Sequence, residues 1–224
     1  RHPKELSLGD LIEDRFTVQS RVESHGLWVL YRVLDQKDGR SRMMQMGSQS
    51  HQSVQEVISS ISILGEEYFL PSVLGVGSAP APFFIFEDCE DITLLDWKST
   101  FPSMRQRRDF CTQMLFVFVQ LSRQGISFGK WDMSRIFVHE RGYIWIHPSS
   151  LRGSNSQENT KLLEWMYWML SDRVQSLEKS RFSLSGLSLR DAHWMRMMVR
   201  RKPSSHQLRN SWHQFSNIDY GMDA

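Results

Sequence analysis

Two cations and one histidine are the side chains of this sequence most suited to chemistry on a phosphate or a metal ion. Lys130 and Arg135 lie five residues apart in the run FGKWDMSR, and His147 follows twelve residues after Arg135. Lys130 and Arg135 could bind an anion, such as a phosphate on a partner, although solvated loop residues are the simpler interpretation. Lys130 carries its proton at neutral pH and cannot act as a general base. A lone histidine at a strand end is more often structural than a ligand, so we predict no metal site.

The composition describes a soluble globular protein and excludes several classes of function. Hydrophobic residues make up 40% of the 224, charged residues 23%, and the net charge of +2 is too small to indicate nucleic acid binding. The densest basic cluster, 196–202, is interpreted as a solvated helix end, with a basic patch as the alternative. Two cysteines without CxxC spacing form neither a zinc site nor a disulfide framework. The longest apolar run, 114–119, is too short for a membrane span.

The pattern of apolar residues predicts which elements position these side chains. Runs rich in β-branched and aromatic residues predict strands, and apolar residues at helical spacing predict helices. The expected strands lie at 16–20, 27–33, 42–46, 70–76 and 82–86, with a helix at 53–64. Farther along, helices are expected at 104–121, 159–170, 187–199 and 204–215, with a polar loop at 149–157. Short strands are expected on both sides of the turn at 140–142. We therefore expect an α+β protein.

This order of elements and motifs resembles that of protein kinases over about residues 8–216. The frame around FGKWDMSR is similar to the kinase sequence H-R-D-x-x-x-x-N, a β-hairpin and D-F-G. The opening resembles bacterial Ser/Thr kinases, with matches at Tyr31, Arg32, Asp35, Gly39 and Arg40. The resemblance implies a two-lobed fold. A five-stranded small lobe with one helix would span 1–89, and a mainly helical large lobe with a shortened activation segment would span 90–224.

Every position that contacts the phosphates, the metal ions or the substrate hydroxyl in kinases carries a different residue here. In the catalytic centre, Phe128 stands for His, Lys130 for the catalytic Asp, Arg135 for the metal-binding Asn and His147 for the metal-binding Asp. In the nucleotide loop, the glycine positions fall on Glu23, His25 and Trp28, where a carboxylate repels phosphate and an indole fills space. The lysine position of the third strand falls on Gln45 or Met46. Glu56 matches the kinase helix glutamate but lacks that lysine as its partner.

The resemblance therefore implies a pseudokinase that binds neither ATP nor another cofactor and has no enzyme activity. We expect it to act as a protein-binding scaffold or allosteric regulator in the cytoplasm, without nucleic acid and without a membrane span. Trp28, Met44, Met46 and Phe86 are expected to fill the nucleotide space as core packing. The alternative is an enzyme that uses the kinase fold for other nucleotide-dependent chemistry, for which only Asp132 and Glu140 lie nearby. Because the first residue is Arg1, a longer protein with a membrane anchor stays open.

Overall fold

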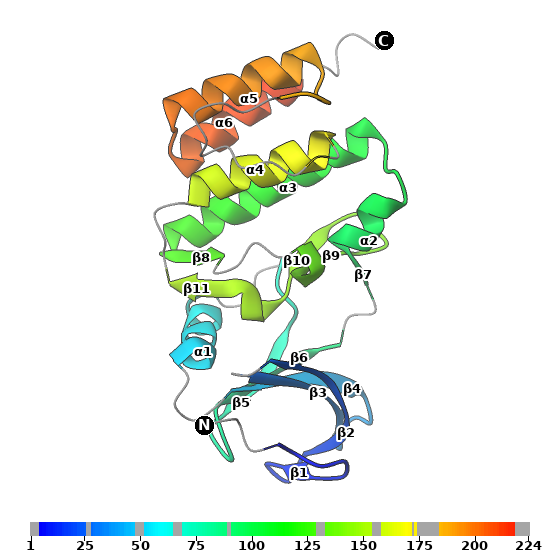
Figure 1. The fold of residues 1–224 in the computed structure, drawn as a ribbon. Coiled ribbons are helices and arrows are strands. Elements are labelled where there is room, and N and C mark those ends of the chain that lie inside the picture. Colours follow the sequence, from blue (N-terminus) through cyan, green and yellow to red (C-terminus); the bar gives the residue numbers. More distant parts are fainter. Residues whose placement is uncertain are drawn as a thin grey trace. The chain divides into compact units, whose positions relative to one another are not determined.

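The chain divides into two compact units, which differ in their secondary structure (Figure 1). The first unit comprises Arg1–Asp91 and Trp145–Arg152, and the second comprises Ile92–Ile144 and Gly153–Ala224. The computed structural model describes residues 5–25, 28–47, 52–64, 69–88, 91–128, 133–153, 158–171, 173 and 184–217. The first unit is built mainly from strands and the second mainly from helices, so the chain is an α+β protein, as expected.

The first unit is organised around a curled antiparallel sheet of six strands in the order β1-β2-β3-β4-β6-β5 (Figure 1). Every neighbouring pair of strands in it is antiparallel. β3 and β4 carry mainly β-branched, aromatic and methionine side chains, and most of their residues are buried, with Arg32 on β3 and Ser41 on β4 exposed. The strands are β1 (Leu11–Ile12), β2 (Phe16–His25), β3 (Trp28–Asp35), β4 (Ser41–Gly47), β5 (Val73–Gly77) and β6 (Phe83–Glu87).

The expected count of five strands is wrong, because β1 adds a sixth at the edge of the sheet. Leu11 and Ile12 pair with Thr17 and Phe16 across a tight turn. Both central residues of this turn, Glu13 and Asp14, have a positive φ, of 49° and 53°. A turn with this backbone matches the twist of a hairpin but normally carries Asn-Gly or Asp-Gly. Because no glycine marks it here, the sequence carried no recognisable hairpin signal.

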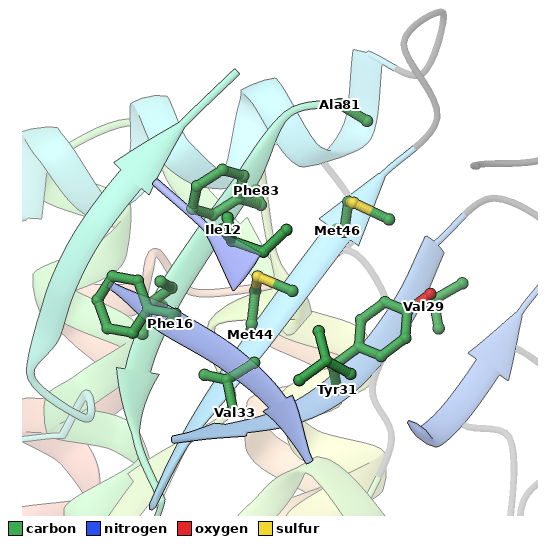
Figure 2. Close-up of a cluster of buried hydrophobic side chains, with 11 residues drawn as sticks. Ile12, Phe16, Val29, Tyr31, Val33, Met44, Met46, Ala81 and Phe83 are labelled. Carbon is green, nitrogen blue, oxygen red and sulfur yellow. The ribbon is translucent and has the colours of Figure 1, made fainter. Parts of the chain in front are cut away.

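One face of the sheet carries the principal hydrophobic core of the first unit. These side chains gather over the strands (Figure 2). Six members of the cluster are wholly shielded from solvent: Tyr31, Val33, Met44, Met46, Phe83 and Ile85. The Tyr31 hydroxyl accepts a hydrogen bond from the Leu6 backbone N–H at 3.0 Å, so the buried ring keeps its polar end satisfied. Each such side chain contributes roughly 1.5–3 kcal/mol to stability by leaving water.

Helix α1 (Gln52–Leu64) connects β4 to β5 and packs against β4. Its buried side chains Val57, Ile61 and Leu64 follow the helical spacing that predicts this helix. A short 3-10 helix, η2 (Pro148–Ser150), contacts α1 within the same unit. β11 (Leu151–Gly153) follows it directly, where a polar loop was expected. The serine-rich composition of 149–157 hid this three-residue strand.

The second unit consists mainly of helices, and α3 packs against both α4 and α6. A capping box starts α3: the Ser103 hydroxyl accepts from the Gln106 N–H, and the Gln106 side chain accepts from the Ser103 N–H. From Asn159 to Ser171, α4 has no exposed residue, as its apolar composition predicts. The helices are α2 (Leu94–Ser99), α3 (Met104–Arg123), α4 (Glu158–Ser171), α5 (Leu189–Arg201) and α6 (Ser205–Asn217).

Three aromatic side chains join α5 and α6 to α3. Trp194 and Trp212 meet edge to face with ring centroids 4.9 Å apart, and Phe215 packs against both. The Trp212 indole donates to the Thr112 hydroxyl at 2.9 Å and the Trp194 indole to the Ser211 hydroxyl at 3.0 Å. Both buried indoles therefore keep a hydrogen-bond partner.

The short elements of the chain are β7 (Ile92–Thr93), β8 (Ile126–Phe128), η1 (Met133–Arg135), β9 (Ile136–Val138) and β10 (Ile144–Ile146).

Candidate functional site

The second face of the six-stranded sheet brings together several of the residues that the sequence singled out. Side chains alternate between the two faces of a strand, and paired residues on neighbouring strands share a face. Met44 and Met46 lie in the core cluster, so their neighbour Gln45 points to the opposite face. The register pairs Gln45 with Leu30 on one side and with Phe84 on the other. The same register places on this face Trp28, Leu30, Met43, Gln45, Phe84 and Phe86.

The two candidates for the lysine position of kinases, Gln45 and Met46, lie on opposite faces of the sheet. Gln45 is 2% exposed on the second face, whereas Met46 is wholly buried in the core on the first. The four residues that were expected to fill the nucleotide space also divide between the two faces. Trp28 and Phe86 lie on the second face, while Met44 and Met46 belong to the core cluster. The four residues therefore do not fill one space together, since consecutive strand residues point in opposite directions.

Gln45 is a buried polar residue in apolar surroundings. Within the described part of the chain, its Oε1 atom has no hydrogen-bond partner. An amide oxygen in this position loses its hydration without compensation, which typically costs about 1–3 kcal/mol. The amide is also neutral, so it cannot supply the positive charge that a lysine would offer to phosphate oxygens. This side chain is consequently a cost to stability and no substitute for a phosphate-binding group.

His147 packs against the same face through Phe86. The two rings are nearly perpendicular, at 87°, with centroids 5.0 Å apart, and His147 is only 6% exposed. Two hydrogen bonds hold its neighbours in the first unit: the Ile146 N–H donates to the Phe69 carbonyl at 2.7 Å, and the Trp145 indole donates to Asp91 Oδ2 at 2.7 Å. The imidazole is thereby fixed as an aromatic packing group against β6.

Trp28 and Glu23 lie on β3 and β2, on either side of the loop that the sequence compares with a nucleotide loop. Trp28 is 8% exposed and pairs with Gly47 on β4, so its indole is part of the buried structure. Glu23 is exposed and pairs with Leu30. The side chain of His25 lies outside the described part of the structure. A buried indole and an exposed carboxylate do not provide the glycine-like approach that phosphate binding needs.

The candidate residues of the second unit are less fully described. Phe128 ends β8 and is 4% exposed, so it serves as a core residue where a kinase has its histidine. Arg135 ends η1 and is partly buried. Lys130 lies outside the described residues, so an anion site made by Lys130 and Arg135 stays a prediction. Within the second unit, η1 contacts both α2 and β7.

Neither metal chemistry nor a reactive thiol is supported in the described residues. No group of three His, Cys, Asp or Glu side chains there is arranged to hold a metal ion. Cys111 is fully buried in α3, and burial raises the pKa of its thiol far above the ordinary value. A buried protonated thiol is inert as a nucleophile. Cys89 lies outside the described residues.

The Phe86–His147 contact and the Trp145–Asp91 hydrogen bond were missed by sequence reasoning. The second joins residues 54 positions apart. Strand patterns indicate which residues are buried but not which distant partner covers them, so neither contact had a signal in the sequence.

No family model matches this chain, and no curated protein matches it in sequence. None of the described helices combines the length and hydropathy that crossing a membrane requires.

Proposed function

We propose that this chain is a pseudokinase, a protein with a kinase-like fold that neither binds ATP nor transfers phosphate. Its function is then to bind other proteins, as a scaffold or as an allosteric regulator. Two observations support the fold part of this proposal. The helix α1 stands between the third and fourth of the expected strands, and a mainly helical unit follows the sheet, in the order that kinases use. The motif positions quoted above occur in the same order along the sequence.

The observation that carries the functional part is the buried packing of Gln45 and His147. Phosphoryl transfer depends on a lysine and on carboxylate-held metal ions that neutralise the phosphate charge. At the corresponding positions, this chain has a buried amide and an imidazole packed against Phe86. Neither group supplies the required charge, and both lie in the interior of the first unit. Because these positions serve packing in the interior, the proposed role of the chain lies in contacts that its surface makes with partner proteins.

The competing class is an enzyme that uses the kinase fold for other nucleotide-dependent chemistry. Such an enzyme needs a metal-binding carboxylate at its site, and no metal-binding cluster occurs among the described residues. The side chains that the sequence places nearest are Asp132, outside the described residues, and Glu140 in an exposed turn. No observation of this structure favours that reading.

The test is intact-mass measurement of the purified chain after incubation with ATP and either Mg²⁺ or Mn²⁺. The proposal predicts no added phosphate and no added AMP, because the charge-neutralising groups are absent. Lys130→Asp restores a single base and should remain equally inactive, since catalytic groups act as a unit. The Lys130→Asn variant is the matched control for loss of the positive charge. Addition of phosphate or AMP to the wild-type chain, above a catalytically dead kinase control, would contradict the proposal.

A further inference from the structure

One side of helix α5 presents cations to solvent, while the other side is buried. Trp194, Met195 and Met198 are at most 3% exposed and form the inner side. The exposed residues His193, Arg196 and Arg200 recur at intervals of three and four, which places them in one stripe along the helix. Arg201 and Lys202 follow Arg200 at the end of the helix, beside this row, and are also exposed. We call Arg196, Arg200, Arg201 and Lys202 the α5 basic stripe.

The charge of this region differs from that of the remaining chain. Residues 192–217, which include most of α5 and all of α6, contain five of the 27 Lys and Arg residues and none of the 25 Asp and Glu residues. The rest of the chain therefore carries 22 basic and 25 acidic residues. A near-neutral protein thus has one strongly positive helical hairpin. Such a concentration of charge steers oppositely charged partners to one surface.

Helix stability alone does not account for the stripe. Cations in the last turn of a helix are favoured by its dipole, which explains Arg200 and Arg201. Arg196 lies more than a turn before the helix end, beyond the range of that effect. Lys202 occupies a left-handed C-cap, with φ 46° and ψ 54°, where glycine is the usual residue. The dipole also gives no reason for the complete lack of carboxylates in 192–217.

The arginines near the stripe fall into two groups. Arg190 lies over the Phe215 ring at 4.6 Å, Arg209 lies over the Phe116 ring at 5.0 Å, and Arg108 forms an ion pair with the buried Asp191 at 3.1 Å. These three hold the helices of the second unit together. By contrast, no ion pair or side-chain hydrogen bond links the stripe to any residue that the structure describes. The stripe is therefore available to an external partner.

The surroundings of the stripe favour an acidic protein segment over other polyanions. A helix that lies in a membrane surface inserts a row of apolar side chains, but the exposed side of α5 carries Leu189 alone, and Trp194 and Trp212 are buried in the helix core. A long nucleic acid would also meet the excess of acidic residues on the rest of the chain. Leu189 stands at the start of α5, 93% exposed, eleven residues before Arg200 or about 16 Å along the helix. A single apolar anchor followed by arginines suits an acidic segment that carries one apolar side chain.

We propose that the α5 basic stripe is a docking surface for an acidic segment of a partner protein. The carboxylates of the segment pair with Arg196, Arg200 and Arg201, whose guanidinium groups bind carboxylates bidentately. The apolar side chain of the segment contacts Leu189. The stripe belongs to the second unit, whereas Gln45 and His147 belong to the first, and the inference holds whether or not the chain binds nucleotide. Failure of one proposal therefore leaves the other intact.

The test is fluorescence anisotropy with three labelled probes at about 50 mM salt, where the Debye length leaves surface charges effective. The probes are a helical peptide with Glu at i, i+4 and i+7 and one Leu, an RNA duplex, and vesicles of phosphatidylserine and phosphatidylcholine. We expect the peptide to bind most tightly. Arg196→Glu/Arg200→Glu should weaken its binding about tenfold, because two attractive pairs become repulsive. Arg196→Gln/Arg200→Gln, which disturbs the helix end less, should weaken it about threefold.

The control is Arg123→Glu/Arg141→Glu, which changes the net charge equally at two other exposed arginines of the second unit. This variant should change peptide affinity less than twofold. Equal losses in the stripe variant and the control would show attraction by net charge alone and would overturn the proposal. Tighter binding of the RNA or of the vesicles than of the peptide, lost in the stripe variant, would also overturn it.

Discussion

The imidazole of His147 stands perpendicular to the ring of Phe86, with the ring centroids 5.0 Å apart. Both side chains are buried in the first unit, and the segment carrying His147 is anchored by the Ile146–Phe69 and Trp145–Asp91 hydrogen bonds. A perpendicular aromatic pair contributes about 0.5–1.5 kcal/mol beyond the area it buries. The position that the kinase resemblance assigns to a metal-binding carboxylate therefore stabilises the first unit directly.

His147→Asp should destabilise the protein rather than create a metal site. The change removes the ring contact with Phe86 and places a carboxylate in a buried, apolar position. We expect the free energy of unfolding to fall by about 2 kcal/mol or more. Urea unfolding followed by tryptophan fluorescence measures the loss. His193→Asp, at an exposed position of α5, is the control and should change stability by less than about 0.5 kcal/mol. Unchanged stability together with Mg²⁺ binding would contradict the packing role.

Gln45→Met should stabilise the protein. The substitution removes an amide oxygen that lacks a partner among the described residues and keeps a similar side-chain volume on the second face. We expect a gain of about 1 kcal/mol, equivalent to a rise in melting temperature of about 2–4 °C for a chain of this size.

Gln113→Met is the matched control for that gain. The Gln113 amide donates to the Gly142 carbonyl at 2.9 Å and accepts from the Ile144 N–H at 3.0 Å. Loss of two formed hydrogen bonds should lower stability, so the two substitutions should have opposite signs. A loss of stability in both variants would mean that Gln45 is satisfied in solution.

Trp28→Ala should reduce the free energy of unfolding by about 3–5 kcal/mol, because removal of a buried indole leaves a cavity. Leu189→Ala removes an apolar side chain that is 93% exposed and should change stability little. Thermal unfolding of the two variants beside the wild type provides the comparison. If Trp28→Ala retains full stability but loses binding to a partner, the indole is an exposed contact and does not fill the interior.

The ion pair between Arg15 and Asp35 should make stability depend on pH in the acid range. Arg15 donates to both carboxylate oxygens, at 2.8 and 2.6 Å, and these hydrogen bonds lower the pKa of Asp35 to about 2 against the opposing effect of burial. In the unfolded chain the pKa of an aspartate is about 3.9. The folded state binds this proton less tightly, so stability is fully present above about pH 4 and is lost as pH falls towards 2.

Asp35→Asn should remove that part of the pH dependence, whereas Asp14→Asn, at an exposed turn, should preserve it. Urea unfolding at pH values from 6 down to 3 measures both slopes. Equal slopes in the wild type and in Asp35→Asn would contradict the role of the ion pair.

The main elements could be predicted because burial leaves a periodic record in the sequence. Val57, Ile61 and Leu64 mark α1 by their spacing, and the β-branched and aromatic residues between Trp28 and Val33 mark β3, although Arg32 interrupts them. β1 could not be predicted, because its turn uses Glu13 and Asp14 in a conformation that other sequences reserve for glycine or asparagine.

The site was predictable as a set of positions but not as an arrangement. The run Met43-Met44-Gln45-Met46 has no alternation of polarity. The sequence alone therefore could not decide whether Gln45 or Met46 lies on the second face of the sheet, with Phe84 and Phe86. Only the register with β3 and β6 separates them. The packing of His147 on Phe86 joins residues 61 positions apart, and the polarity pattern of a strand carries no information on such a partner.

The most direct test of the central claim is a thermal-shift titration of the purified chain with ATP and ADP, each with and without Mg²⁺ or Mn²⁺. A ligand that binds the folded state raises its stability, by roughly 2.7 kcal/mol when present at a hundredfold excess over its Kd. With Gln45 and His147 buried as packing groups, we predict an unchanged melting temperature at millimolar nucleotide under every condition. A rise in melting temperature that needs both nucleotide and divalent metal would contradict the account.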